Sequence, residues 1–191
     1  MWAVHAPHTD PTLPDYLADQ LHIVSIGLNP SWYSVQQGFY FARPQNRFWK
    51  ALNASGLIAE PLTPSREAVE LLFRAYRVGF TDVVKRPSKG ASELHAGDFK
   101  LWAPVLREKL LRYRPGIAWF HGRLAYARYL KHAEGVEAPK SWGKQPLCIG
   151  ATSVFVTPNP SPANAIYSLS DLIAWYCALK ELRDAITRRA V

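Results

Sequence analysis

The sequence is poor in cysteine, and this shortage excludes several kinds of metal site. Its two cysteines, Cys148 and Cys177, are 29 positions apart, and there is no CxxC motif or Cys/His cluster. Neither a structural zinc site nor a cysteine-ligated iron–sulfur cluster therefore has enough ligands. We expect no metal and no cofactor, and we expect both cysteines to be buried thiols.

Long apolar runs are also missing. No stretch approaches the roughly 18 consecutive apolar residues that a membrane helix requires. The first residues contain neither the basic segment nor the apolar segment of a secretory signal. We therefore expect no membrane association and a cytoplasmic location.

Acidic residues are outnumbered, with 15 Asp and Glu against 23 Lys and Arg, which gives a formal charge of +8. Many basic proteins bind no anionic partner, so charge alone does not establish nucleic-acid binding. Aromatic residues make up 13% of the chain and lie beside basic ones, as Trp142 does between Lys140 and Lys144. Such mixtures suit stacking on bases and contact with phosphates, so the composition favours a nucleic-acid partner.

The order of apolar segments predicts an α/β domain with a mainly parallel central sheet. Residues 1–20 are rich in proline and polar groups and are interpreted as an N-terminal arm with a short helix at residues 14–17. Residues 21–191 are interpreted as a single domain. Buried strands are predicted at residues 22–28 and 116–120, and a hairpin or two short strands at residues 147–150 and 153–157.

Helical spacing of apolar residues is found at residues 46–54, 64–76 and 123–132. Residues 92–113 also have helical character, but Gly97 and Pro104 are expected to bend or split that helix. The last helix has the clearest apolar stripe, and Ser168 and Asp171 are placed to form a capping box at its start.

Two predicted strands end at Asn-Pro dipeptides, Asn29-Pro30 and Asn159-Pro160. In open α/β sheets, ligands bind at the carboxyl ends of the strands. The loops that contain these dipeptides are therefore expected to share one site.

Three motifs make this sequence similar to a known family. Residues 27–31 read Gly-Leu-Asn-Pro-Ser, residues 38–49 read Gly-Phe-Tyr-Phe-Ala-Arg-Pro-Gln-Asn-Arg-Phe-Trp, and residues 157–164 read Thr-Pro-Asn-Pro-Ser-Pro-Ala-Asn. With these motifs the chain resembles the mismatch-specific uracil-DNA glycosylase family, which includes thymine-DNA glycosylase, within the uracil-DNA glycosylase superfamily. Agreement at residues 93–97, 113–115 and 142–145 extends the resemblance over nearly the whole domain.

The resemblance implies a three-layer α/β/α fold and a monofunctional DNA glycosylase of base-excision repair. Such an enzyme flips uracil, or a related damaged pyrimidine, out of duplex DNA and hydrolyses its N-glycosidic bond, preferentially opposite guanine. Its partner is double-stranded DNA with a deaminated or damaged base. We expect a monomer that acts on the nucleoid of a bacterial-type cell.

Two residues are the candidates for handling the attacking water. By resemblance, Asn29 positions this water, but an amide is a poor proton acceptor. Asp82 stands where relatives have Lys or Asn, and we hypothesise that its carboxylate acts as a general base. The alternative is that Asp82 caps a turn or pairs with Lys85 or Arg86.

The resemblance also implies residues that bind the flipped base, with Phe41 as the stacking platform. The full set of substrate-binding candidates is Phe41, Ser31, Ser34 and Asn46. Phe39, Phe48 and Trp49 are assigned to the core instead. Ser31 replaces a Gly of better-known relatives, so base preference is open to change.

The second loop is expected to enter the duplex where the base has left. Relatives have a bulkier Leu there, followed by Arg, whereas this chain has only small wedge residues. Asn164 is a candidate partner of the orphaned guanine, or an ordinary polar loop residue. The DNA-binding candidates are Lys144, Asn159, Ser161, Pro162, Ala163 and Asn164.

Two other functions remain open. One is a non-catalytic DNA mismatch-binding module on the same scaffold, and the other is a hydrolase of free nucleosides. Salt separates the second from a duplex enzyme, because screening of phosphate contacts weakens only duplex binding. Among the histidines, His121 alone falls at the predicted sheet edge, where we expect a structural or pocket-rim role.

Overall fold

A computed structural model describes residues 11–189, so half of the predicted arm, residues 1–10, lies outside the described residues. One five-stranded sheet has the order β2-β1-β3-β5-β4. Strands β1 (Ile23–Gly27), β2 (Val78–Asp82), β3 (Ile117–His121) and β5 (Ser153–Thr157) are parallel to their neighbours. The edge strand β4 (Gly143–Lys144) pairs with β5 in the antiparallel direction.

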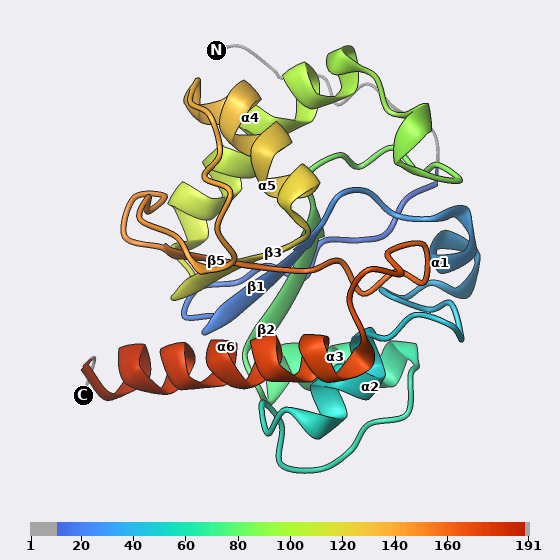
Figure 1. Ribbon diagram of the computed structural model, residues 1–191, viewed down its shortest axis with the longest axis vertical. Helices are drawn as coiled ribbons and strands as arrows, with labels where there is room; N and C mark the ends of the chain where they lie inside the picture. The colour runs from blue at the N-terminus through green and yellow to red at the C-terminus, as the bar shows by residue number, and fades with distance from the viewer. Residues whose placement is uncertain (1–10, 190–191) are drawn as a thin grey trace.

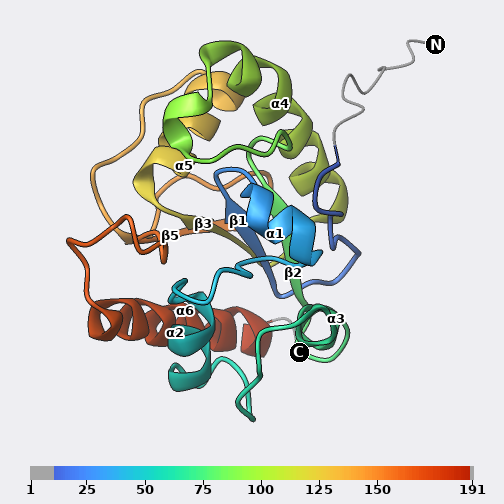
Figure 2. The ribbon, with the colours of Figure 1, turned by 90° about the vertical axis from the view of Figure 1, so that its right-hand side faces the viewer.

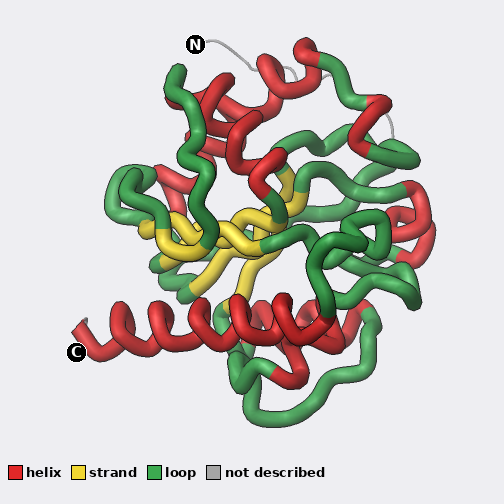
Figure 3. The backbone as a smooth tube through the Cα atoms, in the orientation of Figure 1, coloured by secondary structure: helices red, strands yellow, loops and turns green. Residues whose placement is uncertain are grey.

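Helices cover both faces of this sheet (Figures 1 and 2). One layer contains α2 (Phe48–Ala54), α3 (Arg66–Arg74) and α6 (Leu169–Arg189), and the other contains α4 (Ala96–Tyr113) and α5 (Arg123–Tyr129). Figure 3 shows the strands as a layer between the helices. The predicted three-layer α/β/α fold with a mainly parallel sheet is therefore confirmed.

The strands are apolar along most of their length because both faces of the sheet are buried. Side chains of a strand alternate between faces. Ile23 and Trp119 thus join the core under α2, α3 and α6, whereas Val24 and Phe120 join the core under α4 and α5. Each layer buries its own apolar side chains, which fixes the register of the sheet between them.

Most predicted helices are present with shorter bounds. The capping box of α6 forms, since the Ser168 amide donates to the Asp171 carboxylate at 2.7 Å and the Asp171 amide donates to the Ser168 hydroxyl at 3.1 Å. Helix α3 begins in a similar way, with the Ser65 hydroxyl accepting from the Ala68 amide. A single wider turn, Leu130–Glu134, follows α5.

The short helix predicted at residues 14–17 is wrong. The Tyr16 amide and carbonyl both pair with Phe80 on β2, so this part of the arm forms an antiparallel bridge along the sheet edge. The bridge requires Gly79 beside it, because a β-carbon at position 79 would collide with the Tyr16 carbonyl oxygen. The arm thus covers an edge strand instead of coiling.

Residues 92–113 were expected to form a bent or split helix, and the split is wrong, because α4 runs unbroken from Ala96 to Tyr113. Gly97 lies in its first turn, where amides have no intrahelical partner in any case. Pro104 and Lys100, whose carbonyl loses a donor, are both exposed, so water can hydrate that carbonyl.

Residues 147–150 do not form a strand. Ile149 and Thr152 make one isolated bridge, and the partner of β5 is β4 instead. Strand β4 was not predicted because two residues are too few to show a strand pattern. The helix α1 (Trp32–Gln37) and the strand β2 were likewise not predicted.

Both cysteines were expected to be buried, but Cys148 is exposed and Cys177 is only half-buried. Cys148 lies next to the turn that joins β4 and β5, which stays at the surface. Among residues 11–189, no helix is long and apolar enough to cross a membrane.

Candidate functional site

The carboxyl ends of the four parallel strands bring the predicted site residues to one edge of the sheet. Asn29 follows β1, Asp82 ends β2, His121 ends β3, and Asn159 follows β5. The pairing of Gly27 with Asp82 and of His121 with Thr157 sets these ends level. The prediction that both Asn-Pro loops lie at one edge therefore agrees with the topology.

The side chain of Asn29 is fixed by the segment that follows β2. Its amide nitrogen donates to the Arg86 carbonyl at 3.0 Å, the Ser88 hydroxyl at 2.8 Å and the Pro30 carbonyl at 3.2 Å. Among residues 11–189, no donor reaches its Oδ1 atom. The amide is thus held with its nitrogen toward the protein, and its oxygen remains available as an acceptor.

Asp82 is buried, with only 5% of the residue exposed. Its Oδ1 atom lies against Gly27, where an added β-carbon would be only 2.5 Å away. Its Oδ2 atom has no hydrogen-bond partner within the described chain, and the nearest cation, Lys85 Nζ, is 3.8 Å away. Burial raises the pKa of Asp82 to about 6, although Lys85 opposes this shift.

The alternatives for Asp82 can now be compared. Asp82 is the last residue of β2, and no turn amide of residues 11–189 donates to its Oδ2 atom. Arg86 is engaged elsewhere, with its guanidinium on the Asp98 carboxylate at 2.8 Å. Lys85 does form an ion pair with Asp82, as that alternative expected, but the 3.8 Å between Nζ and Oδ2 is too long for a hydrogen bond.

Ser31 and Ser34 hold the first loop together. The Ser31 hydroxyl caps α1 by accepting from the Ser34 amide at 3.1 Å, and it donates to the Ser34 hydroxyl. The buried Ser34 hydroxyl in turn accepts from the Ala42 amide at 3.4 Å. These bonds place the segment after α1, which contains Phe41, over the end of the sheet.

Phe41 has a left-handed backbone, with φ of 56°. Bulky residues rarely adopt this conformation, and such strained positions are concentrated at functional sites. One face of its ring stacks on Phe48, with centroids 4.1 Å apart and an interplanar angle of 11°. Phe41 is half-buried, whereas Phe48 and Trp49 are buried in the core as predicted.

Asn46 has a local structural contact. Its Oδ1 atom accepts from the Phe48 amide at 2.9 Å and so fixes the start of α2. The side-chain oxygen is therefore occupied, and only its amide nitrogen remains to meet a ligand.

Arg47 links the two loops, a role that the sequence analysis missed. Its guanidinium donates to the carbonyls of Pro160 at 3.3 Å, Ser161 at 3.1 Å and Asn164 at 2.9 Å, and also to the Tyr167 carbonyl. Its own amide donates to the Pro160 carbonyl at 3.1 Å. The sequence signal that could have indicated this role is the position of Arg47 within the motif of residues 38–49.

The polar residues of the second loop bond mainly to one another. The Asn159 side chain accepts from the Ser161 amide at 2.8 Å, and the Asn164 side chain donates to the Asn159 carbonyl at 3.0 Å. Pro162 and Ala163 are exposed between them. Farther along the loop, Ile166 is 87% exposed, a large apolar side chain that the sequence analysis overlooked.

Lys144 lies on the short edge strand β4 and is exposed. The neighbouring Gln145 is buried and donates to the Gly143 carbonyl at 2.9 Å, which shapes this edge. Trp142 connects the segment to the second loop by a 3.0 Å bond to the Tyr167 hydroxyl. Lys144 thus belongs to the same side of the sheet as the second loop.

His121 is buried at the end of β3, and its Nε2 atom lies 2.8 Å from the Ser25 hydroxyl. Burial lowers the pKa of His121 to about 3, so the ring is neutral. The ring packs against Phe41 in an edge-to-face arrangement, with centroids 5.0 Å apart. His121 therefore supports the aromatic platform.

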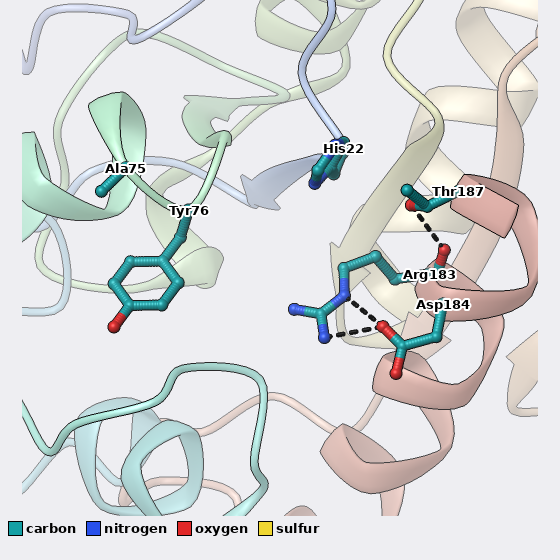
Figure 4. A pocket seen from close by; sticks show the side chains of 6 residues that line it. All are labelled: His22, Ala75, Tyr76, Arg183, Asp184 and Thr187. Carbon is teal, nitrogen blue, oxygen red and sulfur yellow. Dashed lines mark hydrogen bonds and ion pairs between the residues drawn. The ribbon is translucent and has the colours of Figure 1, made fainter. Parts of the chain in front are cut away.

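A cavity of about 290 Å³ lies at the opposite end of the sheet, and its lining is drawn in Figure 4: His22, Ala75, Tyr76, Arg183, Asp184 and Thr187. Arg183 is bonded to the Asp184 carboxylate and to the Leu57 carbonyl. These paired groups suggest no chemistry. Nowhere in the described chain do three His, Cys, Asp or Glu residues gather in a way that could hold a metal.

Comparisons with known proteins identify the family and the fold. The family model of the uracil DNA glycosylase superfamily matches residues 14–180. The fold is similar to the solution NMR structure of a candidate uracil DNA glycosylase from Methanosarcina acetivorans, with a TM-score of 0.57 and 23% identity. That match covers 90% of this chain and 96% of the other. The chain belongs to the uracil DNA glycosylase superfamily.

Proposed function

We propose that this protein is a monofunctional DNA glycosylase that flips uracil, or a related damaged pyrimidine, out of duplex DNA and hydrolyses its N-glycosidic bond. The proposed preference is for uracil opposite guanine, as in the mismatch-specific family that the motifs resemble. The product is an abasic site for base-excision repair. The placement of Asp82 supports the proposal most, because its carboxyl has an oxygen without a hydrogen bond at the strand end beside the Asn29 loop.

The proposed chemistry uses Asn29 and Asp82 together. A water molecule attacks the anomeric carbon, the bond from that carbon to the base breaks, and the bonding electrons leave with the base. The Oδ1 atom of Asn29 orients the water, while Asp82 accepts the proton that the water loses. A carboxylate with a pKa of about 6 is ionised at pH 8 and is a stronger base than an ordinary Asp.

The base is proposed to stack on Phe41. One face of this ring is occupied by Phe48, so the other face is the one that can receive a flipped base. Backbone groups of Ser31 would bind the polar edge of the base, and the buried Ser34 hydroxyl would line the floor of the pocket. Asn46 would contribute only its amide nitrogen, because its oxygen is bonded to Phe48.

The second loop is proposed to enter the duplex, with Ile166 as the apolar wedge. Proteins that distort DNA insert apolar side chains between base steps, and Ile166 is the most exposed large apolar residue of the described chain. Pro162, Ala163 and Asn164 would flank the wedge on the same loop. Asn159 and Ser161 would shape that loop, while Lys144 contacts a phosphate.

A single-turnover assay on labelled duplexes with one G·U, A·U, G·T or undamaged pair tests this function. We expect abasic sites at G·U, strongly reduced rates in Asn29→Ala and Asp82→Asn, and an unchanged rate in Asp19→Asn, which alters an exposed acid of the arm. Loss of all activity in Asn29→Ala, with full activity in Asp82→Asn, would exclude Asp82 as the base.

Binding to the same duplexes and activity on free nucleosides separate the alternative functions. Tight binding to mismatched duplexes without any abasic site would make the protein a non-catalytic DNA mismatch-binding module. Activity on free nucleosides that does not respond to salt would make it a nucleoside hydrolase, because only duplex binding depends on phosphate contacts. We further propose that the protein is cytoplasmic and a monomer. Sedimentation of the purified chain tests the monomer, because it measures the mass of the particle in solution.

A further inference from the structure

A cluster of charged side chains lies next to Asp82, with Lys85 buried and Asp15 and Lys109 half-buried. The Asp15 carboxylate of the arm accepts from Lys85 Nζ at 2.8 Å, from Lys109 Nζ at 2.6 Å and from the Thr81 hydroxyl at 2.8 Å. Lys85 is only 7% exposed. The two acids, Asp15 and Asp82, are balanced by the two cations, Lys85 and Lys109, so the cluster has no net charge.

Within this cluster, Lys85 lies closer to Asp15 than to Asp82. Its Nζ atom is 2.8 Å from Asp15 and 3.2 Å from the Tyr40 hydroxyl, but 3.8 Å from Asp82 Oδ2. Burial alone would raise the pKa of Asp15, but the charges and hydrogen bonds of Lys85 and Lys109 lower it below its usual value. Asp15 is therefore a permanent anion that competes with Asp82 for Lys85.

We propose that Asp15 and Lys85 are positioning residues that keep the Asp82 carboxylate charged while its Oδ2 atom stays without a hydrogen bond. Asp15 holds the ammonium group of Lys85 just beyond hydrogen-bonding distance of Asp82. The proposal rests on the proposed function only in giving Asp82 the role of a base. A segment more than sixty positions earlier in the chain thereby prepares the reactive oxygen.

The role requires Lys85 to be near Asp82 but not in direct contact with it. Without a nearby cation, a buried carboxylate would be protonated at working pH and could not accept a proton. With a cation in direct contact, the carboxylate would be held as an acceptor of that bond and would be a weaker base. The observed separation of 3.8 Å gives Coulombic support without occupying Oδ2.

Other groups near Asp82 do not replace this arrangement. Tyr40, from the segment after α1, is neutral, because burial and then the nearby Asp82 and Asp15 raise its pKa well above the usual value. On β1, Gly27 brings no charge. On β3, His121 is neutral and bonded to Ser25, and Lys109 of α4 acts only through Asp15.

The test is to titrate the Asp82 side-chain carboxyl by carbon NMR in the whole protein, which does not require activity. We expect Lys85→Met to raise the Asp82 pKa by about one pH unit or more, because the nearest cation is lost. We expect Asp15→Asn, which keeps the shape of the side chain, to lower it, because Lys85 is released toward Asp82. Asp19→Asn on the same arm should leave it unchanged.

The pH at which the single-turnover rate falls on the acid side should rise in Lys85→Met and fall in Asp15→Asn. A purely structural role of these residues would lower the rate without changing that pH. The proposal would be overturned if the Asp82 pKa moved in the same direction in Lys85→Met and Asp15→Asn, or if it moved in neither variant. If Lys85→Met does not fold, Asp15→Asn decides, and an unchanged or raised pKa overturns it. Correct NMR shifts without any abasic sites would instead refute the glycosylase function and leave the positioning role intact.

Discussion

The Oδ1 atom of Asp82 occupies the space that a β-carbon at Gly27 would fill, at a separation of 2.5 Å. Only glycine at the end of β1 therefore allows the carboxylate of β2 to lie against the neighbouring strand. Since the Asn29 loop begins two residues later, this close approach ties the candidate base to the candidate water-binding amide.

We predict that Gly27→Ala lowers the single-turnover rate on the order of a hundredfold, because it displaces Asp82 from the site. Gly97→Ala is the matched control. A β-carbon at Gly97 meets nothing within 4 Å, so this variant should keep its rate and gain slightly in helix stability. A Gly27→Ala protein with the normal rate would show that the position of Asp82 is unimportant.

Asp82→Asn should raise stability while lowering activity. The pKa of Asp82 in the folded protein is raised from 3.8 to about 6, because burial disfavours the charged form. The folded state then binds this proton more tightly than the unfolded state does. The associated stability is complete below pH 3.8 and is lost as the pH rises through 6.

At pH 8, Asp82→Asn should therefore increase the free energy of unfolding by up to about 3 kcal/mol, with little gain at pH 4. Urea unfolding at both pH values measures the difference, and Asp19→Asn serves as the exposed control. A variant that is less stable than the wild type at pH 8 would contradict the pKa direction.

Arg47→Lys should loosen the second loop without changing the net charge. A single ammonium group cannot reach the carbonyls that the guanidinium fork binds, so some of them lose their donor. We expect a loss of about 2 kcal/mol in unfolding free energy and slower base excision at G·U. Arg43→Lys, at an exposed position nearby, should change neither quantity.

Ile166→Ala should weaken binding to a G·U duplex roughly tenfold, since about 1–2 kcal/mol of apolar contact is lost. Binding to single-stranded DNA should change little, because there is no base stack for a wedge to enter. Leu71→Ala, at another exposed apolar residue on α3, is the control. Fluorescence anisotropy measures both affinities, and equal losses on both substrates would rule out a wedge.

The fold was predictable because its main elements have local signals. Buried strands such as β3 and β5 are continuous apolar runs, and α6 combines an apolar stripe with a capping box. The structure of the arm was not predictable, because Tyr16 pairs with Phe80 from a distant part of the chain. No local pattern indicates such a bridge, and Pro104 in α4 shows that a breaker on an exposed face is tolerated.

The site was predictable only in part. The loops with Asn29 and Asn159 could be placed because parallel strands share one carboxyl edge. The groups that contact the site residues could not be placed from the sequence. Lys85 was named as an alternative partner of Asp82 because it is three positions away, but Asp15 meets Lys85 only through a tertiary contact that no motif indicates.

The carbonyls gathered around Arg47 have one more consequence. Ordering a loop costs about 1–2 kcal/mol of conformational entropy for each backbone that becomes fixed. Because Arg47 already binds the carbonyls of Pro160, Ser161, Asn164 and Tyr167, much of this cost is met when the protein folds. The loop is thus preorganised, and a larger share of its contact energy remains available to distort DNA.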